Sequence, residues 1–116
     1  MAASAYVRTV SKAAFGNRHR LEVLAAIAAA DKRFYQREVA AATQIPDSTV
    51  APILQSLEKA NLLRVIERIQ ANGPKFYERQ ESIIWTVAAR LFAALDEGER
   101  ASLDELQAGG ANPEQG

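Results

Sequence analysis

Polar side chains recur on one side of a helix that the sequence predicts after Pro46. The side chains on this side carry hydroxyl and amide groups, on Ser48, Thr49 and Gln55. The apolar residues of the same stretch lie at spacings of four and three residues, which places them together on the other side: Val50, Leu54 and Leu57. Hydroxyl and amide groups bind other molecules through hydrogen bonds. This side of the helix is therefore suited to recognition.

The chain offers few groups for catalysis or metal binding. It has no Cys, a single His at position 19, and no Gly-rich phosphate-binding loop. Without Cys there is no thiol nucleophile, the single His gives no plausible catalytic triad, and one His cannot build a zinc site alone. We therefore predict that the protein is not an enzyme and needs no metal or cofactor, and that His19 makes a surface or capping contact.

Two helices joined by a tight turn are predicted for residues 36–63, which read QREVAAATQIPDSTVAPILQSLEKANLL. The first helix covers residues 36–43 and Gln44 lies in the turn, while Asp47 or Ser48 is expected to cap the second helix. Asn61 follows the last turn, where a residue that tolerates the left-handed conformation is needed. This arrangement is a helix-turn-helix, whose second helix can lie in the major groove of DNA. Amphipathic helix pairs are also common packing units, so periodicity alone leaves both interpretations open.

The residues after this motif predict a β-hairpin. The strand-like runs LLRVIERI and KFYERQ flank the turn dipeptide Asn72-Gly73, and a very short strand is expected at residues 33–35. The order helix, helix, short strand, helix-turn-helix, hairpin, helix predicts a mainly α fold with a small β-hairpin, the winged helix-turn-helix, in which the hairpin is the wing. Basic residues expected to contact the DNA backbone are Arg37, Arg64, Arg68, Lys75 and Arg79.

Long helices are predicted at both ends of the chain, over residues 3–15 and from residue 82 onward, with Gly98 breaking or loosening the last one. The last helix has more apolar surface than a chain of this size can cover, so we expect a homodimer. The expected interface residues are Tyr6, Val10, Ile84, Trp85, Ala88, Leu91, Phe92 and Leu95. Residues 1–107 would form the domain with its dimerisation helices, and the Gly-rich residues 108–116 a disordered tail.

Charge is unevenly distributed along this chain of 116 residues, although its formal net charge is +0. Residues 1–95 hold 13 basic and 8 acidic side chains, whereas residues 96–116 hold one basic and six acidic side chains. A basic body with an acidic tail is compatible with a nucleic-acid partner. No signal segment and no apolar window of membrane-spanning length is present, so we expect a soluble, cytoplasmic protein without a membrane partner.

Residues 13–80 resemble the ArsR-type and, more loosely, the MarR-type winged helix-turn-helix regulators of prokaryotes. The resemblance lies in AAFGNRHRLEVLAAIAA, in REVAAATQIPDSTVAPILQSLEKANLL and in KFYER. It implies a dimeric repressor that binds palindromic operators through its recognition helix and wing. Three departures from the pattern are Gln44 and Asn61 at positions that favour Gly, and Pro52 where a base-contacting side chain is usual. The metal-sensing cysteines of ArsR-type proteins are absent.

Two functions therefore compete. The first is sequence-specific binding of double-stranded DNA by a homodimer, with Ser48, Thr49 and Gln55 in the major groove. The second is a winged helix used as a protein–protein interaction module, which Pro52 and the weakly charged helix face favour. An apolar crevice between the terminal helices, near Trp85 and Tyr6, would admit a small-molecule effector.

Overall fold

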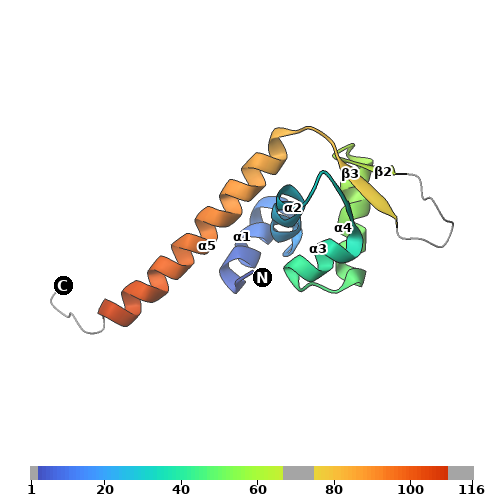
Figure 1. Cartoon of the computed structure of the whole chain (residues 1–116). Helices are drawn as coiled ribbons and strands as arrows, with labels where there is room; N and C mark the ends of the chain where they lie inside the picture. The colour runs from blue at the N-terminus through green and yellow to red at the C-terminus, as the bar shows by residue number, and fades with distance from the viewer. Residues whose placement is uncertain (1–2, 67–74, 110–116) are drawn as a thin grey trace.

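The computed structural model describes the backbone of residues 3–66 and 75–109, and the side chains of residues 3–66 and 75–98. Within these residues the chain forms a mainly helical body with a small antiparallel sheet at one end (Figure 1). The elements in order are α1 (Ala5–Phe15), α2 (Arg20–Ala29), β1 (Arg33–Tyr35), α3 (Gln36–Thr43), α4 (Asp47–Lys59), β2 (Leu63–Ile66), β3 (Phe76–Arg79) and α5 (Ile83–Gly109). This order confirms the predicted winged helix-turn-helix fold. The predicted turn at Asn72-Gly73 lies outside the described residues.

The sheet joins the short strand β1 to the two strands of the wing, in the order β1-β3-β2 with both pairings antiparallel. Tyr77 on β3 pairs in register with Phe34 on β1 and Val65 on β2. The rings of Phe34 and Tyr77 stack with centroids 5.9 Å apart, and both residues are buried. Because alternate residues of a strand face opposite sides, this row attaches the wing to the core.

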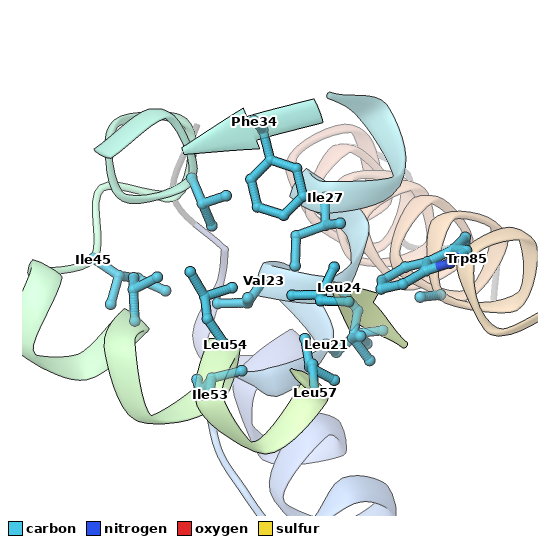
Figure 2. Packing of buried hydrophobic residues seen from close by; sticks show 14 of the residues in the cluster. Leu21, Val23, Leu24, Ile27, Phe34, Ile45, Ile53, Leu54, Leu57 and Trp85 are labelled. Atoms are coloured by element: carbon cyan, nitrogen blue, oxygen red, sulfur yellow. The ribbon is translucent and has the colours of Figure 1, made fainter. Parts of the chain in front are cut away.

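The core lies between α2 and the helices that surround it (Figure 2). Helix α2 is buried on most of its circumference, through Leu21, Val23, Leu24 and Ile27. Trp85 and Ala88 of α5 pack against it with 7% and 0% of their surface exposed. The Trp85 indole Nε1 donates a 2.7 Å hydrogen bond to the Gln80 carbonyl, which satisfies its polar atom.

The burial of Trp85 and Ala88 corrects our prediction that they lie in a dimer interface. Both residues are covered by the chain's own core, so a second copy cannot reach them. Their spacing correctly predicted an apolar face on the last helix. It could not show whether the chain's own core or a second copy covers that face. The other α5 residues of the predicted interface are half-buried against the same core: Ile84, Leu91, Phe92 and Leu95.

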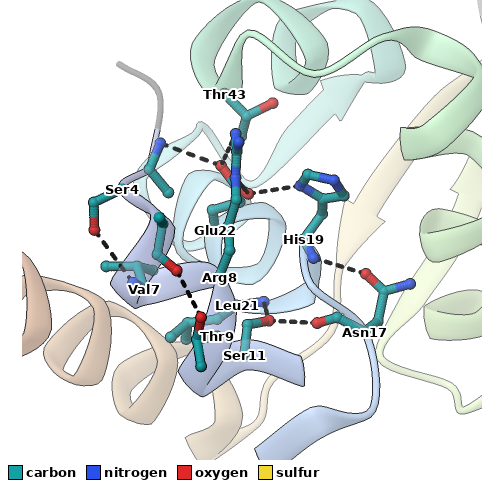
Figure 3. A network of polar contacts seen from close by, with 12 residues as sticks. Ser4, Val7, Arg8, Thr9, Ser11, Asn17, His19, Leu21, Glu22 and Thr43 are labelled. Atoms are coloured by element: carbon teal, nitrogen blue, oxygen red, sulfur yellow. Dashed lines mark hydrogen bonds and ion pairs between the residues drawn. The ribbon is translucent and has the colours of Figure 1, made fainter. Parts of the chain in front are cut away.

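Helix α1 is fixed to α2 by a network of polar contacts (Figure 3). Ser4 caps α1, since its hydroxyl accepts a hydrogen bond from the Val7 N–H, and Gly16 ends the helix at φ 76°, so that the helix stops at residue 15 as predicted. The buried Ser11 hydroxyl donates to the Asn17 carbonyl and accepts from the Leu21 N–H. The Asn17 Oδ1 accepts a 2.8 Å hydrogen bond from the N–H of His19, the N-cap residue of α2.

Glu22 is the centre of this network. Its side chain is buried, with 3% of the residue's surface exposed. One carboxylate oxygen lies 3.0 Å from the Arg8 Nε and 2.9 Å from the His19 Nδ1, and the other accepts from the Ala3 N–H at 3.4 Å. His19 thus makes the side-chain contact expected of a residue near a helix start, and the carboxylate connects α2 to the first residues of the chain that the structure describes.

Helix α5 continues without a break from Ile83 to Gly109. Gly98 therefore does not break the helix, and the helix includes residues 108 and 109, which we had assigned to the tail. A single Gly in a helix costs about 1 kcal/mol relative to Ala, which the hydrogen bonds of neighbouring turns tolerate. Across the described residues, no helix combines the length and apolarity needed to cross a membrane.

A row of charged side chains crosses the sheet on the face away from the core. Glu78 on β3 pairs in register with Arg33 and Arg64 on the flanking strands. Its carboxylate accepts hydrogen bonds from the Arg33 Nε at 3.1 Å and from the Arg64 guanidinium. These two hydrogen bonds, that of Arg33 first, hold the pKa of Glu78 below its ordinary value of 4.5.

Replacing Glu78 by Gln is expected to lower stability at neutral pH and to remove part of its pH dependence. A carboxyl with a lowered pKa in the folded state stabilises the fold above pH 4.5, and this contribution is lost as pH falls through the folded pKa. The urea midpoints of the wild type and Glu78→Gln should therefore converge in acid. Glu81→Gln, at an exposed position, serves as the control. A difference between the urea midpoints of the wild type and Glu78→Gln that stays constant at all pH values would contradict the prediction.

Candidate nucleic-acid interface

The turn between α3 and α4 is built on a left-handed residue. Gln44 has φ 59°, and its N–H bonds to the Ala40 carbonyl, which also accepts from the Ile45 N–H at 3.2 Å. Ile45 is buried and fills the space between the two helices. The turn therefore has the left-handed conformation for which Gly is favoured. Gln44 adopts it at a modest energetic cost, as its position in the sequence predicted. Asn61 ends the region in the same way at φ 62°.

Helix α4 begins at Asp47, with Pro46 as its N-cap. The Pro46 carbonyl accepts from the N–H groups of Thr49 and Val50 at 2.9 and 3.1 Å. Neither Asp47 nor Ser48 caps the helix, which corrects the prediction. The Asp47 carboxylate instead accepts a 3.1 Å hydrogen bond from the Gln36 side chain, because the turn brings the starts of α3 and α4 close together.

The two sides of α4 are sharply different. Its core side is buried through Val50, Ile53, Leu54 and Leu57. Ser48, Pro52 and Gln55 are exposed on the opposite side, and Thr49 is half-buried at its margin. Lys59 lies four residues after Gln55 on the same exposed side. Lys59 was not among the predicted DNA-binding residues, although its i+4 spacing from Gln55 was a sufficient signal.

Pro52 is the sixth residue of α4, two positions later than a cap at Ser48 would have given. A proline has no backbone N–H, so the Ser48 carbonyl receives no helical hydrogen bond from residue 52. The ring of Pro52 is exposed in the middle of the outer side. The outer side is therefore polar at Ser48, apolar at Pro52, polar at Gln55 and cationic at Lys59.

Two of the predicted backbone-contacting residues meet beside the start of α3. Arg37 is exposed and Lys75 is half-buried, and both line an open depression together with Tyr35, Gln36 and Asp47. The Lys75 ammonium lies 5.4 Å from the centre of the Tyr77 ring, within the range of a cation–π contact. The fold thus brings a cation of the wing base next to a cation of the helix-turn-helix.

The remaining predicted cations have other positions. Arg64 is exposed but shares the Glu78 carboxylate with Arg33. The Arg79 guanidinium donates to the carbonyls of Ile27 and Ala30 at 2.7 and 3.1 Å, at the C-terminal end of α2. Arg79 is therefore a structural residue that satisfies the last carbonyls of a helix, and we remove it from the expected DNA contacts. Arg68 lies outside the described residues.

Residues 20–66 match the family model described as the IclR helix-turn-helix domain. The matched range runs from the start of α2 to the end of β2, and so includes both α3 and α4. Searches of curated proteins and of solved structures gave no match. The match supports a helix-turn-helix transcriptional regulator, a class that is in general not enzymatic, but it does not support the ArsR or MarR subtype. The chain thus carries a helix-turn-helix domain of the kind with which transcription regulators bind double-stranded DNA.

Proposed function

We propose that the protein is a sequence-specific transcriptional regulator that binds operator DNA as a homodimer and acts as a repressor. The observation that supports this most is the outer side of α4, which no described part of the chain covers: Ser48, Pro52 and Gln55 are all exposed. In helix-turn-helix proteins the second helix enters the major groove with its N-terminal residues toward the bases. Ser48 and Pro52 lie in the first half of α4, and Gln55 follows on the same side as its ninth residue.

Cations flank this helix on two sides. Arg37 and Lys75 lie beside its start, and Lys59 lies in its last turn on the outer side. When the outer side of α4 enters the groove, these side chains are in position to contact phosphates on the groove's two edges. Phosphate contacts fix the position of a protein on the duplex, while base contacts determine its sequence preference.

The homodimer is supported by an uncovered apolar strip on α5. Ile83 and Val87 are 75% and 45% exposed, and the exposed Ala94 continues the strip at helical spacing. Tyr6, on the neighbouring helix α1, is 49% exposed. Exposed large apolar side chains on two helices that contact each other favour an interaction surface, and a twofold dimer covers the same surface on both copies. Tyr6 and Val10 thus remain in the proposed interface, together with Ile83 and Val87.

The repressor role is proposed from simple occlusion. A dimer that covers an operator within a promoter excludes polymerase from the same DNA. Such a regulator would act in the cytoplasm, where the DNA is. A reporter gene under the chain's own upstream region, compared in cells with and without the protein, tests the sign of the effect, and activation of the reporter would contradict the repressor role.

Binding to a duplex from the upstream region is expected to weaken steeply with salt, because each phosphate contact releases counterions. Arg37→Ala and Lys75→Ala should each reduce the slope of log K against log[salt] by about one. Lys12→Ala, on the exposed side of α1, should leave the slope unchanged. The measurement is fluorescence anisotropy over a salt series, and binding that is absent or insensitive to salt would overturn the proposal.

A protein–protein interaction module is the second candidate, and one observation favours it. Between Asp47 and Lys59 the outer side of α4 carries no cation, whereas Arg and Lys make the commonest specific base contacts. The two functions predict different effects of Gln55→Ala on operator affinity and on binding to protein partners. Reduced affinity for the operator with unchanged protein partners supports DNA readout, and the opposite result supports the interaction module.

A further inference from the structure

Pro52 occupies a position on α4 that the packing of this chain does not explain. A proline in a helix interior removes a hydrogen bond and destabilises the helix. Residues on the other side of α4 recover such a loss by burial in the core, but Pro52 is exposed. Its ring lies on the outer side between Ser48, one turn before it, and Gln55, one turn after it. The ring is therefore a rigid apolar group at the centre of the proposed reading surface.

The chemistry of this surface matches A·T base pairs. Guanine is read by Arg or Lys, and neither is present on the outer side of α4 before Lys59 in the last turn. An amide such as that of Gln55 can donate to N7 and accept from N6 of adenine. Apolar groups contact the C5-methyl group of thymine, and the ring of Pro52 and the methyl group of the half-buried Ala51 are adjacent on this surface.

We infer that α4 reads a thymine methyl group through the ring of Pro52, next to an adenine read by Gln55, so that each half-site contains A·T pairs at both positions. This inference rests on the proposed function, because it names the DNA that the same surface selects. It gives Pro52 a role in specificity, and the helix bond lost at Ser48 is the consequence of placing an apolar ring there.

The test uses the full chain and a duplex that it has selected from a random library. Each thymine of the selected site is replaced in turn by deoxyuridine, which removes only the C5-methyl group. We expect one position per half-site at which this replacement weakens binding about fourfold, the value of one buried methyl group. Replacements at the other thymines should have little effect.

Two variants assign the methyl contact to a residue. Pro52→Ser restores a backbone N–H and removes the apolar ring, and a circular dichroism spectrum unchanged from the wild type verifies its fold. It should bind the thymine duplex as weakly as the wild type binds the deoxyuridine duplex, and it should no longer distinguish the two. Gln55→Ala should keep the fourfold methyl effect and lose its preference for adenine, while the control Lys12→Ala should keep both.

The outcomes separate this inference from the proposed function. Salt-sensitive binding of a specific site in which no methyl group matters would overturn the inference and leave the regulator intact. A methyl effect that persists in Pro52→Ser would overturn it as well. Absence of any duplex binding by the wild type would overturn the proposed function, and the inference with it.

Discussion

Ile83→Asp combined with Val87→Asp is expected to convert the dimer to a monomer and to weaken operator binding on the order of a hundredfold or more. Both side chains are exposed on the apolar strip of α5. In a dimer each would be buried against its twin, and an unpaired carboxylate there is strongly disfavoured. A monomer contacts a single half-site, so it loses the gain that comes from linking two binding events.

Sedimentation velocity measures the first effect and anisotropy on a full palindromic site the second. Ala93→Asp is the matched control, because Ala93 is exposed on α5 but lies about 120° around the helix axis from Val87. It should remain dimeric with unchanged affinity. A double variant that still sediments as a dimer would place the interface elsewhere, and a wild type that sediments as a monomer would remove the dimer from the proposal.

Glu22→Ala is expected to lower the free energy of unfolding by about 3 kcal/mol, since breaking a buried ion pair leaves its partner uncompensated. The carboxylate has three partners, and loss of all of them leaves the Arg8 guanidinium beside an apolar cavity. Arg8 is partly exposed, with 25% of its side-chain surface in solvent. The expected loss of about 3 kcal/mol therefore lies at the low end of the range for breaking a buried ion pair.

Urea unfolding followed by circular dichroism measures this loss. Glu97→Ala provides the comparison, because Glu97 is also a helical glutamate but is exposed on α5, and it should change stability by less than about 0.5 kcal/mol. Equal effects of the two substitutions would mean that the Glu22 network contributes nothing beyond the local helix. Arg8→Ala should reproduce part of the loss, because it leaves the Glu22 carboxylate with one partner fewer.

The periodic features of this fold could be predicted from the sequence. Val50, Leu54 and Leu57 are buried as their spacing indicated, and Gly16, Gln44 and Asn61 have the left-handed conformations that end or join the helices. These predictions depend only on neighbouring residues. The short strand β1 and the wing strands were predictable for the same reason, since β-branched and aromatic runs favour strands.

The features that sequence could not predict depend on contacts between distant segments. Arg79 bonds to the end of α2, 52 and 49 residues earlier in the chain, and no local pattern indicates that pairing. Glu22 is a carboxylate that local reasoning places on the surface, yet α1 covers it. Trp85 and Ala88 share a face as expected, but only the packed structure reveals that α2 covers this face rather than a second copy.

The unbroken course of α5 determines how the chain's negative charge is arranged in space. Residues 96–109 hold five acidic side chains and one basic side chain, and this part of the helix is about 20 Å long at 1.5 Å per residue. It points away from the wing and from α4 (Figure 1). In the proposed complex this length would keep most of the acidic part of α5 out of range of the DNA phosphates, because dissolved ions screen charges over about 8 Å at physiological salt. A net charge of zero is therefore compatible with the proposed DNA contacts of Arg37, Lys59 and Lys75.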